Sequence, residues 1–269
     1  MLSLLVITLL VINLLIIYLH FVRGYEHLKG FIHGFYFDAE ANFPSLYSAL
    51  AISFCSMLLW VIARSDNTRA EKRSSYWKVL AIIFAFLAMD EFASIHEHMI
   101  QPVKTIIDGS PIRSDYLYFA WFIPYTVITL LILLAYARFF FKLPSRTRRL
   151  FASAAGLFLI GAVGMEIAGG KYWASQGWAV EGSDPVDLTY ALIITIEELL
   201  EMFGIIIFIY ALLDYHLRTT RYAFLLHVAL SAPATDNVAD PTLKPLRSSS
   251  SDSVFNRSEV IGTEPVPGD

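Results

Sequence analysis

The sequence predicts an all-α, polytopic membrane protein: a bundle of six transmembrane helices followed by a disordered C-terminal tail. Of the 269 residues, 56% are hydrophobic, which exceeds the roughly 45–50% typical of soluble domains. These residues are gathered into blocks of about 20, the length that a helix needs to cross a bilayer. Most lysines and arginines lie in the short loops between the blocks, as in multi-pass membrane proteins.

The first three spans are predicted at 2–21, 44–63 and 77–99. The first lacks the basic start and the small-residue cleavage site of a signal peptide, so we expect it to be retained. The second is uncharged. The third is apolar from Val79 to Met89 and then continues as DEFASIHEHM, which places charged residues inside a predicted membrane helix.

The last three spans are predicted at 116–137, 150–168 and 188–213, and the last contains TIEELLEMFG. Span 150–168 contains two pairs of small residues spaced four apart, a pattern that suits close packing of membrane helices. These pairs are Ala152 with Gly156 and Gly164 with Ala168. Tryptophans and tyrosines at the ends of spans are typical of interfacial anchors. They are Trp60, Trp77, Tyr116, Trp121, Trp173 and Trp178.

Three regions make up this organisation. Residues 1–217 form the transmembrane domain. Residues 218–232 include an apolar run too short to span a bilayer, so they are predicted to form an interfacial helix. Residues 233–269 are rich in Ser, Pro, Asp and Thr, and they are predicted to be a disordered cytoplasmic tail because they cannot bury a core.

The distribution of basic residues predicts the orientation. Loops 64–78 and 138–149 hold ten lysines and arginines together, whereas the three loops on the opposite side hold five. The basic loops stay in the cytoplasm, so both termini are predicted to be cytoplasmic, in the inner (plasma) membrane. The net charge of −4 provides no basic surface for nucleic acid. The sequence does not determine the oligomeric state.

Six carboxylates lie inside the predicted spans, without a lysine or arginine at the same depth. Each charge in a bilayer costs about 3 kcal/mol or more, so these groups must be neutralised by protons, by bound cations or by water. The six are Asp90, Glu91, Glu166, Glu197, Glu198 and Glu201.

Depth and helical face predict that these carboxylates converge. At 1.5 Å per residue, all six lie between the bilayer centre and its outer face. Glu97 and His98 share a helical face with Asp90 and Glu91, and Glu197 stacks four residues before Glu201. Tyr190 shares a face with this last pair. The stretch FYFDAEANFP (35–44) adds Asp38, Glu40 and Asn42 at the same level.

The leading hypothesis is a divalent metal site of unknown metal identity, because clustered carboxylates and imidazoles bind such ions. A metal-bound water acting on a lipid-like or other small-molecule substrate would make the protein an enzyme, although the sequence leaves open whether it is one. The predicted metal ligands are Asp90, Glu91, Glu97, His98, Glu166, Glu197, Glu198 and Glu201.

Two alternatives use the same residues. A proton- or cation-coupled transporter also places carboxylates at membrane depth. The inner halves of the third and sixth spans, 79–89 and 202–213, carry no charge, which disfavours a continuous polar path. In the second alternative the protein is a structural or assembly subunit, and protonated acids hold its helices together.

Three strings carry a resemblance: FDAEANFPSLYS (37–48), DEFASIHE (90–97) and EELLEMFGI (197–205). Together they resemble an uncharacterised family of bacterial multipass membrane proteins, over predicted spans two to six. The resemblance implies a bacterial membrane protein and brings no known activity or ligand.

Overall fold

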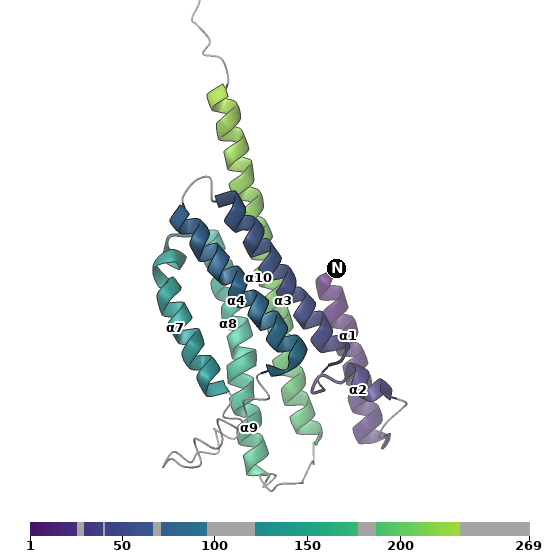
Figure 1. Ribbon diagram of the computed structural model, residues 1–269. Coiled ribbons are helices and arrows are strands. Elements are labelled where there is room, and N and C mark those ends of the chain that lie inside the picture. Colours follow the sequence, from purple (N-terminus) through teal and green to yellow (C-terminus); the bar gives the residue numbers. More distant parts are fainter. Residues whose placement is uncertain (26–29, 40, 67–70, 96–121, 177–186, 232–269) are drawn as a thin grey trace, which may run out of the picture. The chain divides into compact units, whose positions relative to one another are not determined.

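The computed structural model describes residues 1–25, 30–39, 41–66, 71–95, 122–176 and 187–231. Within these ranges every regular element is a helix, which confirms the all-α class. The helices are α1 (Leu2–Ile17), η1 (Tyr18–Val22), α2 (Phe31–Phe35), α3 (Phe43–Asp66), α4 (Glu71–Ala93), α7 (Phe122–Phe141), α8 (Ser145–Leu159), η4 (Ile160–Met165), α9 (Glu166–Ser175) and α10 (Leu188–Ser231). Figure 1 shows their course. The chain divides into two units, Met1–Leu226 and His227–Asp269.

Four helical segments among the described residues are long and apolar enough to cross a membrane, which supports a membrane protein. They are Leu2–Val22, Phe43–Ser65, Ile123–Phe141 and Ser145–Ser175, and they correspond to the predicted first, second, fourth and fifth spans. The predicted third and sixth spans are α4 and α10. These two helices carry most of the predicted site, and their crossing of the membrane remains a proposal.

The helices α3 and α4 form an antiparallel hairpin and make extensive contact with each other. Two serines join them: Ser56 Oγ donates to the Ala81 carbonyl at 2.7 Å, and Ser74 Oγ donates to the Ala63 carbonyl at 2.8 Å. Hydrogen bonds of this kind hold helices together where lipid offers no polar partner. The hairpin is therefore a rigid unit that fixes the position of the carboxylates at the end of α4.

An apolar core fills the half of the bundle that lies towards the basic loops. Trp77 is fully buried there, against the rings of Phe139, Phe151 and Tyr215. The prediction that Trp77 is an interfacial anchor is therefore wrong, because its ring fills a space between helices. Stacking of Phe84 on Phe208, with centroids 4.9 Å apart, continues this core towards the centre of α10.

Two glycines permit a close approach of α10 to α8 and η4. A Cβ on Gly204 of α10 would lie 2.9 Å from Phe158 N and 3.0 Å from the Ala154 carbonyl oxygen of α8. A Cβ on Gly161 would lie 2.9 Å from the carbonyl oxygen of Glu197. The predicted pairs are on a different face, since nothing among the described residues lies within 4 Å of a Cβ on Gly156. The four-residue spacing of small residues therefore predicted the correct helix for a close contact, but not the residues that make it.

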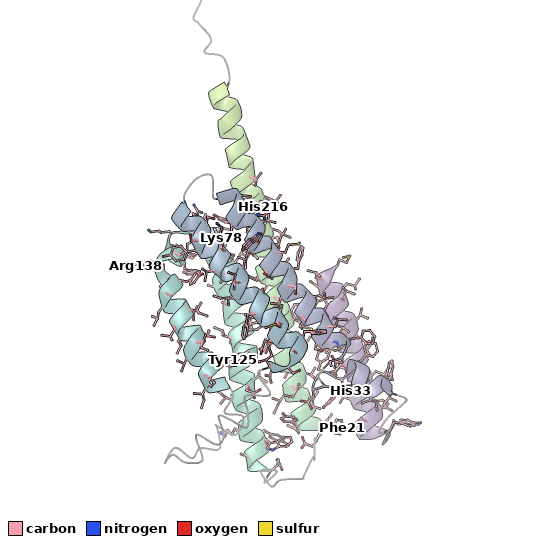
Figure 2. The ribbon with its side chains drawn as sticks, in the orientation of Figure 1. Phe21, His33, Lys78, Tyr125, Arg138 and His216 are labelled. Carbon is pink, nitrogen blue, oxygen red and sulfur yellow. The ribbon has the colours of Figure 1, made fainter. Side chains whose placement is uncertain are left out.

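The basic end of the bundle contains paired charges. Asp214 of α10 accepts from Arg218 Nε at 2.9 Å, and it lies 3.3 Å from Arg146 Nε of α8. Arg73 of α4 donates to Tyr215 Oη. Lys78, Arg138 and His216 lie towards this end in Figure 2, whereas Tyr125 and His33 lie towards the other.

α10 is continuous from Leu188 to Ser231, so one helix covers both the predicted sixth span and most of the predicted interfacial helix, 218–232. The predicted disordered tail, 233–269, lies outside the described residues.

Candidate acidic site

α10 provides the centre of the acidic site. Glu197 is buried, with 8% of its surface exposed, and its Oε2 atom accepts no hydrogen bond from the described residues. The charged groups that act most strongly on it are other carboxyls: Glu166, Glu198 and Asp38. Glu201, one turn further along, lies within the electrostatic influence of Glu198, Glu197, Glu91 and Glu166.

A π-helical segment positions Glu166. η4 runs from Ile160 to Met165, and Glu166 comes directly after it. The extra residue of a π-helical turn rotates α9 relative to α8, and such turns are frequent at functional sites. The Glu166 and Glu197 carboxyl groups are in hydrogen-bond contact. A carboxylate only accepts hydrogen bonds, so this contact requires a proton on one member of the pair.

α4 contributes through its last turn. Asp90 has 6% of its surface exposed and accepts from Tyr125 Oη at 3.0 Å, which ties α4 to α7. Its neighbour Glu91 lies towards Glu201. The helix then ends, because Ser94 has a positive φ of 49°. The helical arc predicted to continue to Glu97 and His98 is therefore interrupted at Ser94.

The segment between α2 and α3 brings Asp38 to the cluster. Asn13 of α1 is fully buried, accepts from Phe37 N at 3.0 Å and donates to Thr195 Oγ1 of α10 at 2.9 Å. This side chain links α1, the 36–39 segment and the turn of α10 that precedes Glu197. Asn42 in turn donates to the Tyr36 carbonyl at 2.6 Å.

Two non-glycine residues with positive φ flank the cluster. Ala41 has φ 53° and Ser94 has φ 49°. Such backbone conformations cost about 1–3 kcal/mol each and gather at functional sites. Ala41 lies three residues after Asp38, and Ser94 lies three residues after Glu91.

Aromatic side chains stand beside the carboxyls. Tyr190 has 7% of its surface exposed, and its ring centroid lies 5.1 Å from that of Trp173. Asp38, Glu166 and Glu197 all act electrostatically on Tyr190. Asp187 accepts from Tyr190 N at 2.8 Å and from Tyr172 Oη at 2.6 Å, which fixes the start of α10 against α9.

The structure thus brings together much of the predicted set. Glu166 and Glu198 act electrostatically on both Glu197 and Glu201, and Glu91 acts on Glu201, whereas Asp90 is engaged by Tyr125. Glu97, His98 and Glu40 lie outside the described residues. No group of three or more His, Cys, Asp or Glu among the described residues has the arrangement of a metal site, so the structure gives the metal hypothesis no direct support.

Sequence reasoning missed Asn13, Tyr36 and Tyr125, and it assigned Trp173 to the membrane interface. Asn13 carried a usable signal, since it is a polar residue in the middle of an otherwise apolar predicted span. Tyr36 and Tyr125 carried none, because tyrosines are common near the ends of membrane helices.

A family model matches residues 2–216, which include every described residue of the acidic site. Its description is a domain of unknown function, DUF8692. The chain belongs to this family. No curated protein and no solved structure matches the chain. Membership in DUF8692 agrees with the expected uncharacterised family, and it leaves the function to be argued from the site.

Proposed function

We propose that this DUF8692 member is a multi-pass membrane protein whose acidic site binds a cation within the bilayer. The observation that carries the proposal is Glu197: a buried carboxyl, surrounded by other carboxyls, with one oxygen that no described residue engages. In this proposal the chain crosses the membrane six times, with α4 and α10 as the remaining two spans and both termini in the cytoplasm of a bacterial cell.

Mutual repulsion is the physical reason that a cation is needed. Carboxylates that share a site cannot all remain charged, because like charges strongly oppose ionisation at short distance. The low dielectric of the interior strengthens that repulsion. Positive charge must therefore enter the site, as protons on the carboxyls or as a bound cation.

A divalent metal is one source of that charge. Because the described residues alone offer no three-donor group, a metal would need Glu97 or His98 as additional ligands. A metal-bound water could then act on a lipid-like substrate at the membrane surface. This enzyme proposal depends entirely on the metal, and it fails if the neutralising charge is a proton.

The apolar core favours binding over transport. Between Glu201 and the basic end, α10 presents Ile205, Ile209 and Leu212 to a core that includes Phe151 and Trp77. From Glu201 to Tyr215 this covers about 21 Å of helix. A coupled transporter would need polar groups through this depth, so we favour a site open to one side.

Two variants test the proposal on the purified protein in lipid nanodiscs. Glu197→Gln removes a site carboxylate, and Asp214→Asn is the control, because Asp214 is a carboxylate of the same helix that pairs with arginines outside the site. Elemental analysis, proton uptake and melting temperature are measured for each. A bound metal that Glu197→Gln alone removes, together with its chelator sensitivity, supports the metal form.

If protons neutralise the site, no metal is found, and Glu197→Gln takes up fewer protons while keeping or raising the melting temperature. That result is expected because glutamine imitates a protonated glutamate. A metal-free protein in which Glu197→Gln melts well below the control, with unchanged proton uptake, would show that the carboxyls are structural. The proposal would then give way to a structural or assembly subunit.

A further inference from the structure

We propose that the cation held at this site is an organic ammonium group, carried by a small amine or by a lipid headgroup. The inference rests on the proposed cation-binding function and names its ligand. It stands on the aromatic walls beside Glu197, on the oxygen acceptors around it, and on an aromatic hydroxyl buried close by.

The aromatic walls come from α9 and α10. The rings of Trp173 and Tyr190 lie with centroids 5.1 Å apart and planes at 64°, so they form two sides of a corner. Tyr190 lies within the electrostatic influence of Glu166 and Glu197, and of Tyr36 as a third aromatic residue. Aromatic faces attract ammonium groups through their negative π-surface, and cages of such rings recognise alkylated ammonium ions.

The acceptors fit the same ligand. A primary ammonium presents three N–H donors, and a buried one needs oxygen atoms to receive them. Glu197 Oε2 is a buried carboxyl oxygen that no described residue engages, and Glu166 and Asp38 lie beside it. Carboxylates also supply the opposite charge that a desolvated ammonium requires.

A buried hydroxyl suggests a second feature of the ligand. Tyr36 Oη is buried and finds no hydrogen-bond partner among the described residues, although it lies near Tyr190 and Asp38. A ligand oxygen close to the ammonium group would accept a hydrogen bond from Tyr36 Oη. Amino alcohols and the headgroups of aminophospholipids both place an oxygen two carbons from the nitrogen, which makes ethanolamine the simplest probe.

The other cations explain less of this arrangement. A divalent metal needs several oxygen or nitrogen ligands in a compact shell, and the described residues form no such group. A proton would account for the contact between Glu166 and Glu197, but it would gain nothing from the Trp173 and Tyr190 rings. An organic ammonium uses both the carboxyls and the rings.

The test measures binding of ethanolamine and of choline to the full-length protein in detergent, by calorimetry and by the shift of melting temperature. Tyr190→Leu removes one ring, Tyr190→Phe keeps it, and Glu197→Gln removes a charge. Tyr210→Leu is the control, since Tyr210 is a tyrosine of the same helix that accepts a hydrogen bond from Arg146 outside the site. Trp173→Leu is a second ring variant in case Tyr190→Leu does not fold.

We expect Tyr190→Leu or Trp173→Leu to weaken binding at least about fivefold. Glu197→Gln should weaken it more, and Tyr190→Phe and Tyr210→Leu should stay within about twofold. Nanodiscs made of phosphatidylethanolamine, compared with nanodiscs made of phosphatidylglycerol, distinguish a lipid headgroup from a free amine as the ligand. A lipid ligand raises the melting temperature only in the former, whereas a free amine binds equally in both.

Three outcomes overturn the inference. If metal or protons occupy the site and neither amine nor aminophospholipid binds, the ligand class is wrong and the cation-binding function stands. If ammonium binds equally to wild type and to the ring variants, the aromatic corner is not its site. If the site takes up no cation of any kind, the proposed function fails as well.

Discussion

Gly204→Ala tests the close contact between α10 and α8. The added Cβ would meet Phe158 N at 2.9 Å, and the Ala154 carbonyl oxygen and Phe158 Cβ at 3.0 Å each. These atoms are backbone or Cβ, so no flexible side chain can move aside. Carbon atoms normally approach non-bonded neighbours to about 3.5–4.0 Å, and relief therefore requires α10 to shift away from α8.

The magnitude comes from a comparison with Gly156→Ala. Overpacking of this kind costs about 1–3 kcal/mol, and both substitutions gain the same helix propensity of about 1 kcal/mol. Gly156 lies on α8 between Ala154 and Phe158 in sequence, yet its Cβ position is open. The two variants should therefore differ by about 1–3 kcal/mol, the overpacking cost alone.

Thermal unfolding of both variants in the same detergent, monitored by circular dichroism, measures this difference. At about 2–4 °C per kcal/mol for a chain of this size, Gly204→Ala should melt roughly 2–12 °C below Gly156→Ala. Equal melting temperatures for the two variants would refute the close approach of α8 and α10.

Three further predictions concern the site and its supports. Gly161→Ala should perturb the site, because its Cβ would lie 2.9 Å from the Glu197 carbonyl oxygen. We expect this variant to take up less cation than the control Gly164→Ala, whose added Cβ would have its nearest neighbour 3.8 Å away. Asn13→Ala should lower the free energy of unfolding by about 1–3 kcal/mol, because it leaves Phe37 N–H and Thr195 without their partner; a chemical denaturation curve that matches the wild type would contradict this. Burial, with Asp38 nearby, raises the pKa of Tyr36 above its ordinary 10.0. The unfolded chain then loses this proton first as pH rises above about 10, so stability falls there, and Tyr36→Phe should flatten the decline of melting temperature between about pH 9 and 11.

Apolar length predicted where the first two spans lie. Predicted spans 2–21 and 44–63 correspond to Leu2–Val22 and Phe43–Ser65, because a membrane helix must be apolar along its whole lipid-facing length. Predicted span 150–168 lies within one long helical stretch, Ser145–Ser175, although the π-helical turn before Glu166 left no mark in the pattern. Depth and helical face predicted that carboxylates of the third, fifth and sixth spans converge, and Glu91, Glu166 and Glu197 all act electrostatically on Glu201.

The hydrophobic and small-residue patterns of the sequence did not predict local backbone geometry or which residues of neighbouring helices make contact. Ser94 ends α4 through a positive φ, and nothing in DEFASIHEHM distinguishes this serine from one inside a helix. Gly161 and Gly204 make the close crossing, while the four-residue spacing pointed to Gly156 and Gly164. Which face of a helix meets a neighbour depends on how the helices are rotated about their axes, and small-residue spacing does not define that rotation.

The apolar core behind the acidic site has a consequence for energetics. In the function proposed above, a cluster closed on one side by Trp77, Phe151 and Leu212 would exchange its cation with a single compartment. Its occupancy would then be an equilibrium property that depends on the composition of that compartment, with no net flux across the membrane. Such a site can report or retain a solute, but it can neither dissipate an ion gradient nor draw work from one.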